Sequence, residues 1–264
     1  GCSYKLSNPI LLNTNTKIAK ESAISFTGMG LGQVFRYLFT TLLARWAGVE
    51  LLGIYSLANA VTRISEVIAK LGLDQGILRK VSREGNIESK QTAILSALKM
   101  GSISGLIFML IQIALAGFLA EDIFNQSSLL TKVIAIHAFS LPFYIIIHIS
   151  AFSTQAYKLL KYKIVVTEIQ NPLILLLAMI VCYFFYSAES AIIIPVVLSA
   201  VLGCITITIF LKKVSGINIL SVNKGMFNRD LLNYSLPIML MSTLGIVLHW
   251  TDVIMLGYYT DPAT

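Results

Sequence analysis

Residues 94–119 read ILSALKMGSISGLIFMLIQIALAGFL, a stretch in which Lys99 is the single charged residue. A helix needs about 20 predominantly apolar residues to cross the hydrocarbon core of a bilayer, so this stretch is long enough to span a membrane. Similar stretches recur along the whole chain. Together they predict spans over residues 22–45, 51–77, 94–119, 130–153, 163–187, 190–211 and 231–258. The predicted fold is therefore an all-α polytopic transmembrane helical bundle of about seven spans.

The composition also indicates a membrane protein. Hydrophobic residues make up 56% of the 264 residues, charged residues 12%, and the mean hydropathy is +0.79, whereas soluble domains carry about 25% charged residues. Cys182 and Cys204 fall inside predicted spans without the paired spacing of metal ligands, so we interpret them as small core residues. The sequence contains no nucleotide-binding P-loop, no HExxH motif and no nucleophile elbow. We therefore predict that the chain is not an enzyme and holds no cofactor or metal.

The basic residues of the connections indicate how the chain is oriented. They alternate between the two sides of the predicted bundle, and nearly all fall on the side of the N-terminus: Lys5, Lys17, Lys20, Arg79, Lys80, Arg83, Lys90, Lys158, Lys161, Lys163, Lys212, Lys213, Lys224 and Arg229. The opposite side has Arg45 and Lys132, beside several acidic residues. Because basic residues concentrate in cytoplasmic loops, we predict a cytoplasmic N-terminus. The basic residues are then topology signals, and no nucleic-acid partner is expected.

The domain organisation follows from these spans. We expect a cytoplasmic N-terminal tail over 1–21, a six-helix transmembrane lobe over 22–214, a cytoplasmic linker over 215–230, and the first helix of a second lobe over 231–264. The chain stops directly after the seventh span, so we expect that second lobe to be truncated.

Charged residues inside the second predicted span are the strongest functional signal. Residues 59–74 read NAVTRISEVIAKLGLD, and on a helix Asn59, Arg63, Glu66, Lys70 and Asp74 fall within an arc of about 80°. An ionised side chain at the bilayer centre costs roughly 2.5–3.5 kcal/mol even on the more lenient scale. These side chains must therefore face protein or water. The first span carries a matching polar stripe of Gln33, Arg36 and Thr40.

Two interpretations of the charged stripe remain. In one, Glu66 pairs with Arg63 and Lys70 at helical spacing, as buried ion pairs that hold helices together. In the other, the stripe lines a water-filled cavity. Cations outnumber anions between residues 36 and 79, and Arg offers a planar fork to phosphate. The excess of cations favours a cavity for an anionic substrate, with Arg36, Arg63, Lys70, Gln33 and Asn59 as candidate binding residues.

Three acidic residues are candidates for ion coupling or for charge pairing, namely Glu66, Asp74 and Asp252. Asp252 lies in the last span, where an unpaired carboxylate is unfavourable. It either binds a coupling ion or pairs with a cation on another span.

The chain resembles the oligosaccharide flippases, or polysaccharide biosynthesis proteins, of the multidrug/oligosaccharidyl-lipid/polysaccharide exporter superfamily. The turn between the first two spans carries the resemblance through Ala44, Arg45, Gly48, Gly53 and Tyr55. The exit of the second span continues it with Leu71, Gly72, Leu73, Asp74 and Arg79. The segments STQAYKLLKYKIVVTEIQNP (153–172) and TDVIMLGYYTDPAT (251–264) are also similar to the family.

The resemblance implies a function. Members of the family have two six-helix lobes around a central cavity and move an undecaprenyl-pyrophosphate-linked oligosaccharide across the bacterial inner membrane by alternating access. Coupling to an H⁺ or Na⁺ gradient is implied, with Glu66 and Asp252 as candidates in this chain. The expected partners are the lipid-linked oligosaccharide, membrane lipids, and a glycan polymerase and glycosyltransferases of the same biosynthetic system.

Two other functions stay open. An ion-coupled small-molecule or multidrug exporter of the same superfamily would favour acidic cavity residues, against the excess of cations here. An integral membrane glycan polymerase would carry a large outer loop, whereas every predicted outer loop is short.

Overall fold

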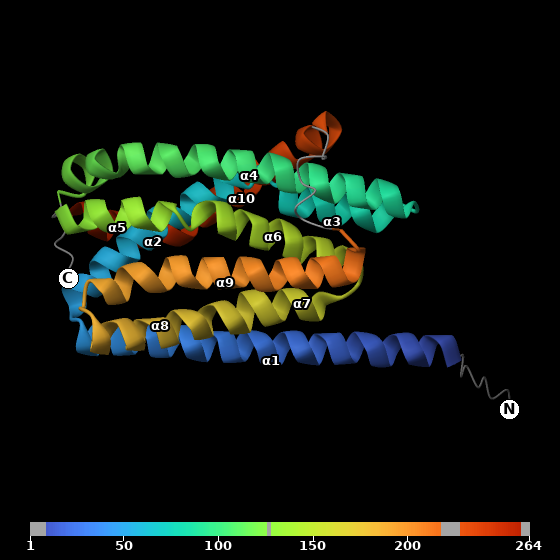
Figure 1. Cartoon of the computed structure of the whole chain (residues 1–264), viewed down its shortest axis with the longest axis horizontal. Helices are drawn as coiled ribbons and strands as arrows, with labels where there is room; N and C mark the ends of the chain where they lie inside the picture. Colours follow the sequence, from blue (N-terminus) through green and yellow to red (C-terminus); the bar gives the residue numbers. More distant parts are fainter. Residues whose placement is uncertain (1–8, 126–127, 218–227, 260–264) are drawn as a thin grey trace, which may run out of the picture.

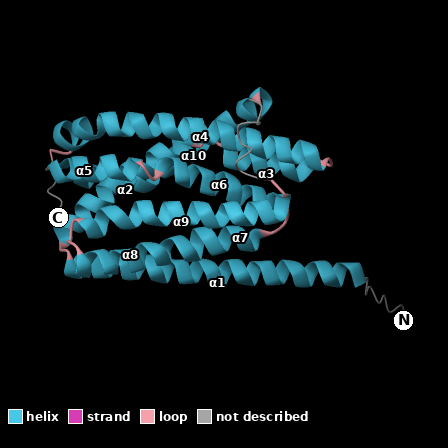
Figure 2. Cartoon of the chain, in the orientation of Figure 1, coloured by secondary structure: helices cyan, strands magenta, loops and turns pink. Residues whose placement is uncertain are grey.

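The computed structural model describes residues 9–125, 128–217 and 228–259, and the secondary structure within these ranges is entirely helical (Figure 2). In chain order the elements are α1 (Pro9–Trp46), α2 (Val49–Ala69), α3 (Leu73–Arg83), α4 (Ile87–Gly117), the π-helix η1 (Phe118–Ile123), α5 (Ser128–Ala138), α6 (Leu141–Ala156), α7 (Leu160–Ile164), the π-helix η2 (Val165–Gln170), α8 (Asn171–Phe185), α9 (Ser190–Ser215) and α10 (Arg229–Tyr259). The predicted all-α helical bundle is confirmed.

The helices lie side by side, and their connections gather at the two ends of the bundle (Figure 1). The α1–α2, α4–α5 and α8–α9 connections lie at one end, and the α3–α4 and α6–α7 connections lie at the other. We call the first the turn end, after the α1–α2 turn, and the second the basic end, because its connections carry the basic residues. The alternation of basic residues in the sequence thus corresponds to two ends of one bundle. Which end faces the cytoplasm stays a prediction.

Breaks divide two of the predicted spans. The span 51–77 consists of α2 and α3, and between them Leu71 and Gly72 have positive φ angles of 52° and 67°. A side chain at Gly72 would collide with the backbone carbonyl of Ser235 on α10, so glycine is required there on two grounds. The span 130–153 consists of α5 and α6, which are bent by 40°, with Pro142 in the first turn of α6. Apolar residues continue on both sides of each break, which is why the sequence predicted continuous spans.

Among the described residues, length and apolar composition qualify four helical segments as membrane spans, or five if α5 and α6 form one bent span. The predicted number of about seven is higher than this criterion supports. The predicted spans 22–45 and 51–77 fall short because Gln33 and Arg36 lower the hydropathy of the first and Arg63 and Glu66 that of the second. Both nevertheless form helices packed within the bundle, and they carry the charged site described below.

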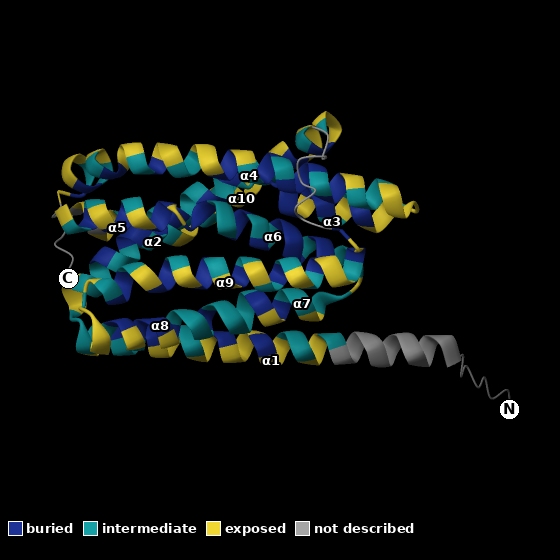
Figure 3. Ribbon diagram, viewed as in Figure 1, coloured by how far each residue is buried: buried dark blue, intermediate teal, exposed yellow. Residues whose placement is uncertain are grey.

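Buried and exposed positions alternate along the long helices (Figure 3). Many of the exposed residues are large and apolar, whereas the buried ones include small and polar residues. On α4, Ile103, Ile107 and Leu110 are exposed, whereas Ser104 and Gly105 are buried. A side chain on Gly105 would press against Pro142 of α6, so glycine permits the close approach of these helices. Apolar residues toward lipid and small residues between helices are typical of membrane bundles.

Candidate functional site

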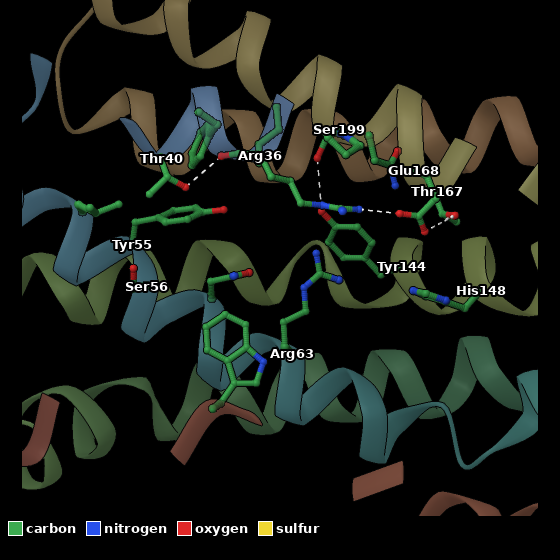
Figure 4. Close-up of a pocket in the computed structure, with 17 residues that line it drawn as sticks. Arg36, Thr40, Tyr55, Ser56, Arg63, Tyr144, His148, Thr167, Glu168 and Ser199 are labelled. Atoms are coloured by element: carbon green, nitrogen blue, oxygen red, sulfur yellow. Dashed lines mark hydrogen bonds and ion pairs between the residues drawn. The ribbon is translucent and has the colours of Figure 1, made fainter. Parts of the chain in front are cut away.

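A cavity of about 480 Å³ lies between α1, α2, α6, α8 and α9, with residues of η2 and α10 completing its wall (Figure 4). Its volume falls within the range of about 300–1,000 Å³ that is common for small-molecule sites. The lining combines charged, hydroxyl, amide and aromatic side chains: Arg36, Phe39, Thr40, Leu52, Tyr55, Ser56, Asn59, Arg63, Tyr144, His148, Thr167, Glu168, Asn171, Pro172, Leu175, Ser199 and Trp250.

Arg63 of α2 presents its guanidinium to this cavity. Its Nη1 donates to Glu66 Oε2 over 2.7 Å, and its Cζ lies 4.6 Å from the centre of the Tyr144 ring on α6. The Arg63 side chain is 34% exposed, whereas that of Glu66 is 3% exposed. The cavity therefore contacts the cation, and the carboxylate that fixes the cation stays behind it.

Glu66 is contacted by three basic side chains. Besides Arg63, its Oε1 lies 3.0 Å from His148 Nε2 and 3.6 Å from Lys70 Nζ. Lys70 continues the network, because its Nζ lies 3.5 Å from Asp74 Oδ2 across the break between α2 and α3. A buried carboxylate needs such partners, since desolvation of an unpaired charge is strongly unfavourable.

Arg36 of α1 forms a second ion pair on the opposite wall. Its Nη2 lies 2.9 Å from Oε2 of Glu168, which belongs to the π-helix η2 (Figure 4). Within the described residues, the basic side chains closest to Glu168 in sequence, Lys161 and Lys163, form no ion pair with it. Instead, Lys163 donates to Gln155 and lies over the ring of Phe152, and α1 packs against η2. A side chain on Gly32 would collide with the backbone carbonyl of Glu168, so this glycine allows the contact.

The charge balance of the site differs from that of the sequence stripe. Within the described residues, the cations Arg36, Arg63 and Lys70 are paired with the carboxylates Glu66, Asp74 and Glu168. Arg79, which contributed to the expected excess of cations, instead contacts Tyr234 of α10. Its Nη1 donates to the Tyr234 hydroxyl, and its Cζ lies 4.4 Å from the centre of the Tyr234 ring. The positive character of the cavity thus arises from the exposure of Arg36 and Arg63, and not from a net excess of cations.

The structure brings some of the predicted site residues together and leaves others apart. Arg36, Asn59 and Arg63 line the cavity. Gln33 is exposed on α1 outside the lining, and Lys70 lies in the ion-pair network behind it. Asp252 is exposed on α10, and the described part of the chain provides no ion pair for it.

Several lining residues were not predicted. Tyr144 and His148 come from α6, Thr167 and Glu168 from η2, and Ser199 from α9. Tyr144, His148 and Ser199 each stand between apolar neighbours in the sequence, whereas Thr167 and Glu168 belong to a short polar stretch. In both cases helical spacing alone does not indicate which helices face each other. In the part of the chain that the structure describes, no three metal-binding side chains gather in one place.

Comparison with protein families gives one match. The model for the polysaccharide biosynthesis protein family matches residues 18–264, which covers nearly the whole chain. Comparisons with curated proteins and with solved structures give no match. Since the family match includes every element that builds the cavity, the chain belongs to the polysaccharide biosynthesis protein family.

Proposed function

We propose that this protein is a flippase that moves an undecaprenyl-pyrophosphate-linked oligosaccharide across the bacterial inner membrane by alternating access. The family match supports a role in polysaccharide biosynthesis, and the apolar surface supports a multi-pass membrane protein. The cavity supplies the chemistry, because two guanidinium groups on different helices line it. Guanidinium groups bind phosphate through paired, charge-assisted hydrogen bonds.

The single observation that carries this proposal is the exposure of the arginines relative to their partners. Arg36 and Arg63 are 41% and 34% exposed, whereas Glu168 and Glu66 are 22% and 3% exposed. A pyrophosphate that enters the cavity would meet the cations first. A small-molecule exporter for cationic drugs would need the opposite arrangement, and Glu168, the one carboxylate in the described lining, is paired with Arg36.

Coupling to an H⁺ or Na⁺ gradient belongs to the same proposal. Glu66 and Asp74 lie in the network next to the cavity, and His148 links that network to the cavity lining. Glu66 is the best-placed candidate, since Asp252 is exposed on α10 away from this network.

The proposal is tested by replacing the exposed cations in the full-length protein. We expect Arg36→Gln and Arg63→Gln to abolish translocation of a fluorescent polyprenyl-pyrophosphate oligosaccharide in proteoliposomes, with normal amounts of folded protein. Arg83→Gln is the control, because Arg83 is an exposed arginine of α3 outside the cavity. Normal translocation by both cavity variants would contradict the proposal.

A further inference from the structure

The two halves of the cavity have different chemistry. Along α2, the lining residues follow the order Leu52, Tyr55, Ser56, Asn59 and Arg63 from the turn end toward the basic end. The charged lining residues all lie toward the basic end (Figure 4), and they are Arg36, Arg63, His148 and Glu168. The half near the turn end, from Leu52 to Asn59 on α2 and including Phe39 and Thr40 of α1, has no charged side chain among its described residues. We call it the neutral half.

Aromatic packing fixes the position of Tyr55 in the neutral half. Its ring centre lies 5.0 Å from that of Phe39 on α1 and 6.1 Å from that of His137 on α5. With the ring held between two helices, its hydroxyl points into the cavity (Figure 4). A tyrosine in this position offers an apolar edge and a polar group to one ligand.

The polar groups of the neutral half divide into two kinds. Thr40 donates its hydroxyl to the Arg36 carbonyl over 3.0 Å, so its donor is already used. Within the described residues, the side chains of Ser56 and Asn59 and the hydroxyl of Tyr55 make no hydrogen bond to protein. One amide and two hydroxyl groups with unused donors and acceptors therefore line one uncharged space.

We propose that the neutral half binds an uncharged sugar, the one attached directly to the pyrophosphate, while the phosphates lie at Arg36 and Arg63. This inference rests on the proposed function and adds to it an orientation and a class of sugar. A sugar ring has apolar C–H faces that pack on aromatic rings and hydroxyls that exchange hydrogen bonds with amide and hydroxyl groups. A cavity of about 480 Å³ holds the pyrophosphate and the first sugar rather than a whole oligosaccharide. An acidic sugar would place its carboxylate in a half whose described lining offers no cation to pair with it.

The test compares three lipids bound to the full-length protein in nanodiscs. The probes are a short-chain polyprenyl pyrophosphate, the same lipid carrying one N-acetylglucosamine, and the same lipid carrying one glucuronic acid. For the wild type we expect the neutral sugar to tighten binding about tenfold over the bare lipid, as expected when several buried polar groups gain partners. We expect glucuronic acid to give less than a third of that gain.

The decisive test uses variants of the neutral half. For each variant we compare the affinity for the lipid carrying N-acetylglucosamine with the affinity for the bare lipid, as a ratio. We expect Asn59→Leu to bring this ratio to within about twofold of one, and Tyr55→Phe to lower it by about threefold. Trp46→Leu is the control, since Trp46 packs on Tyr183 and Phe184 outside the cavity and should keep the wild-type ratio. A wild-type ratio in Asn59→Leu, or glucuronic acid bound as tightly as N-acetylglucosamine, would overturn the inference.

The same data separate this inference from the proposed function. Suppose that Arg63→Gln loses binding of the bare lipid and that no sugar tightens binding to the wild type. This result would support the pyrophosphate site and reject the neutral half as a sugar site. Failure of the wild type to bind any of the three lipids would reject both.

Discussion

At the scale of single residues, Glu66 holds the charged half of the cavity together. Its carboxylate contacts Arg63, Lys70 and His148 and is almost completely buried. The contacts to Arg63 and Lys70 follow the i,i+3 and i,i+4 spacing of one helix, so the sequence could indicate them. The contact to His148 comes from α6, and no local pattern in either helix specifies it. Helical spacing thus predicted two of the three contacts of Glu66, and tertiary packing supplied the third.

The two carboxylates at the cavity should differ in their contributions to stability. We expect Glu66→Gln to lower the free energy of unfolding by about 3–5 kcal/mol, because it leaves buried basic groups without a counter-charge. Glu168→Gln should cost less than about 1 kcal/mol, because its partner Arg36 is 41% exposed and solvent weakens the pair. Thermal unfolding in detergent should therefore show a large fall in Tm for Glu66→Gln and little change for Glu168→Gln. Equal shifts would show that burial does not determine the strength of these pairs.

At the scale of elements, the contact of α1 with η2 decides where Arg36 lies. A π-helix forms i→i+5 hydrogen bonds instead of the i→i+4 bonds of an α-helix, and it is frequently found at functional sites. Here Glu168 lies in η2, and its backbone carbonyl faces Gly32 of α1, one turn before Arg36. The sequence places Gly28, Gly30 and Gly32 on this part of α1, and small residues allow close helix packing. It could not indicate which of them is in contact, because the register between two helices depends on the partner.

Two neighbouring glycines test this contact directly. A methyl group on Gly32 would collide with the Glu168 carbonyl, whereas a methyl group on Gly30 meets no atom within 4 Å. We expect Gly32→Ala to destabilise the protein by about 1–3 kcal/mol through overpacking against backbone and to reduce translocation. Gly30→Ala should stabilise it by about 0.5–1 kcal/mol, as is usual for glycine in a helix. A Gly32→Ala protein with the wild-type Tm would mean that α1 and η2 are not packed in this way.

At the scale of the whole molecule, the sequence predicted the kind of fold and the grouping of connections better than the course of individual helices. The positions of apolar stretches and basic residues depend on the surrounding membrane, so composition reveals them directly. Breaks such as Leu71–Gly72 depend on close contacts, in this case with Ser235 of α10, and are hidden from composition. For the same reason, Arg36, Asn59 and Arg63 could be predicted from α1 and α2, whereas the opposite walls of the cavity from α6, η2 and α9 could not.

The orientation of the bundle yields the last prediction. With the basic end in the cytoplasm, a cysteine at position 85 should be shielded in intact cells from a membrane-impermeant maleimide, and a cysteine at position 189 should react. We would introduce Gly85→Cys and Glu189→Cys, both at exposed positions in connections, into a background without Cys2, Cys182 and Cys204. Labelling of Gly85→Cys should appear only after permeabilisation, and labelling of Glu189→Cys should be the same before and after.

The reverse pattern would place Arg79, Lys80 and Arg83 outside the cell, against the rule that basic connections stay in the cytoplasm. It would also reverse the direction in which the charged half of the cavity faces, so that the pyrophosphate would have to approach from the opposite leaflet.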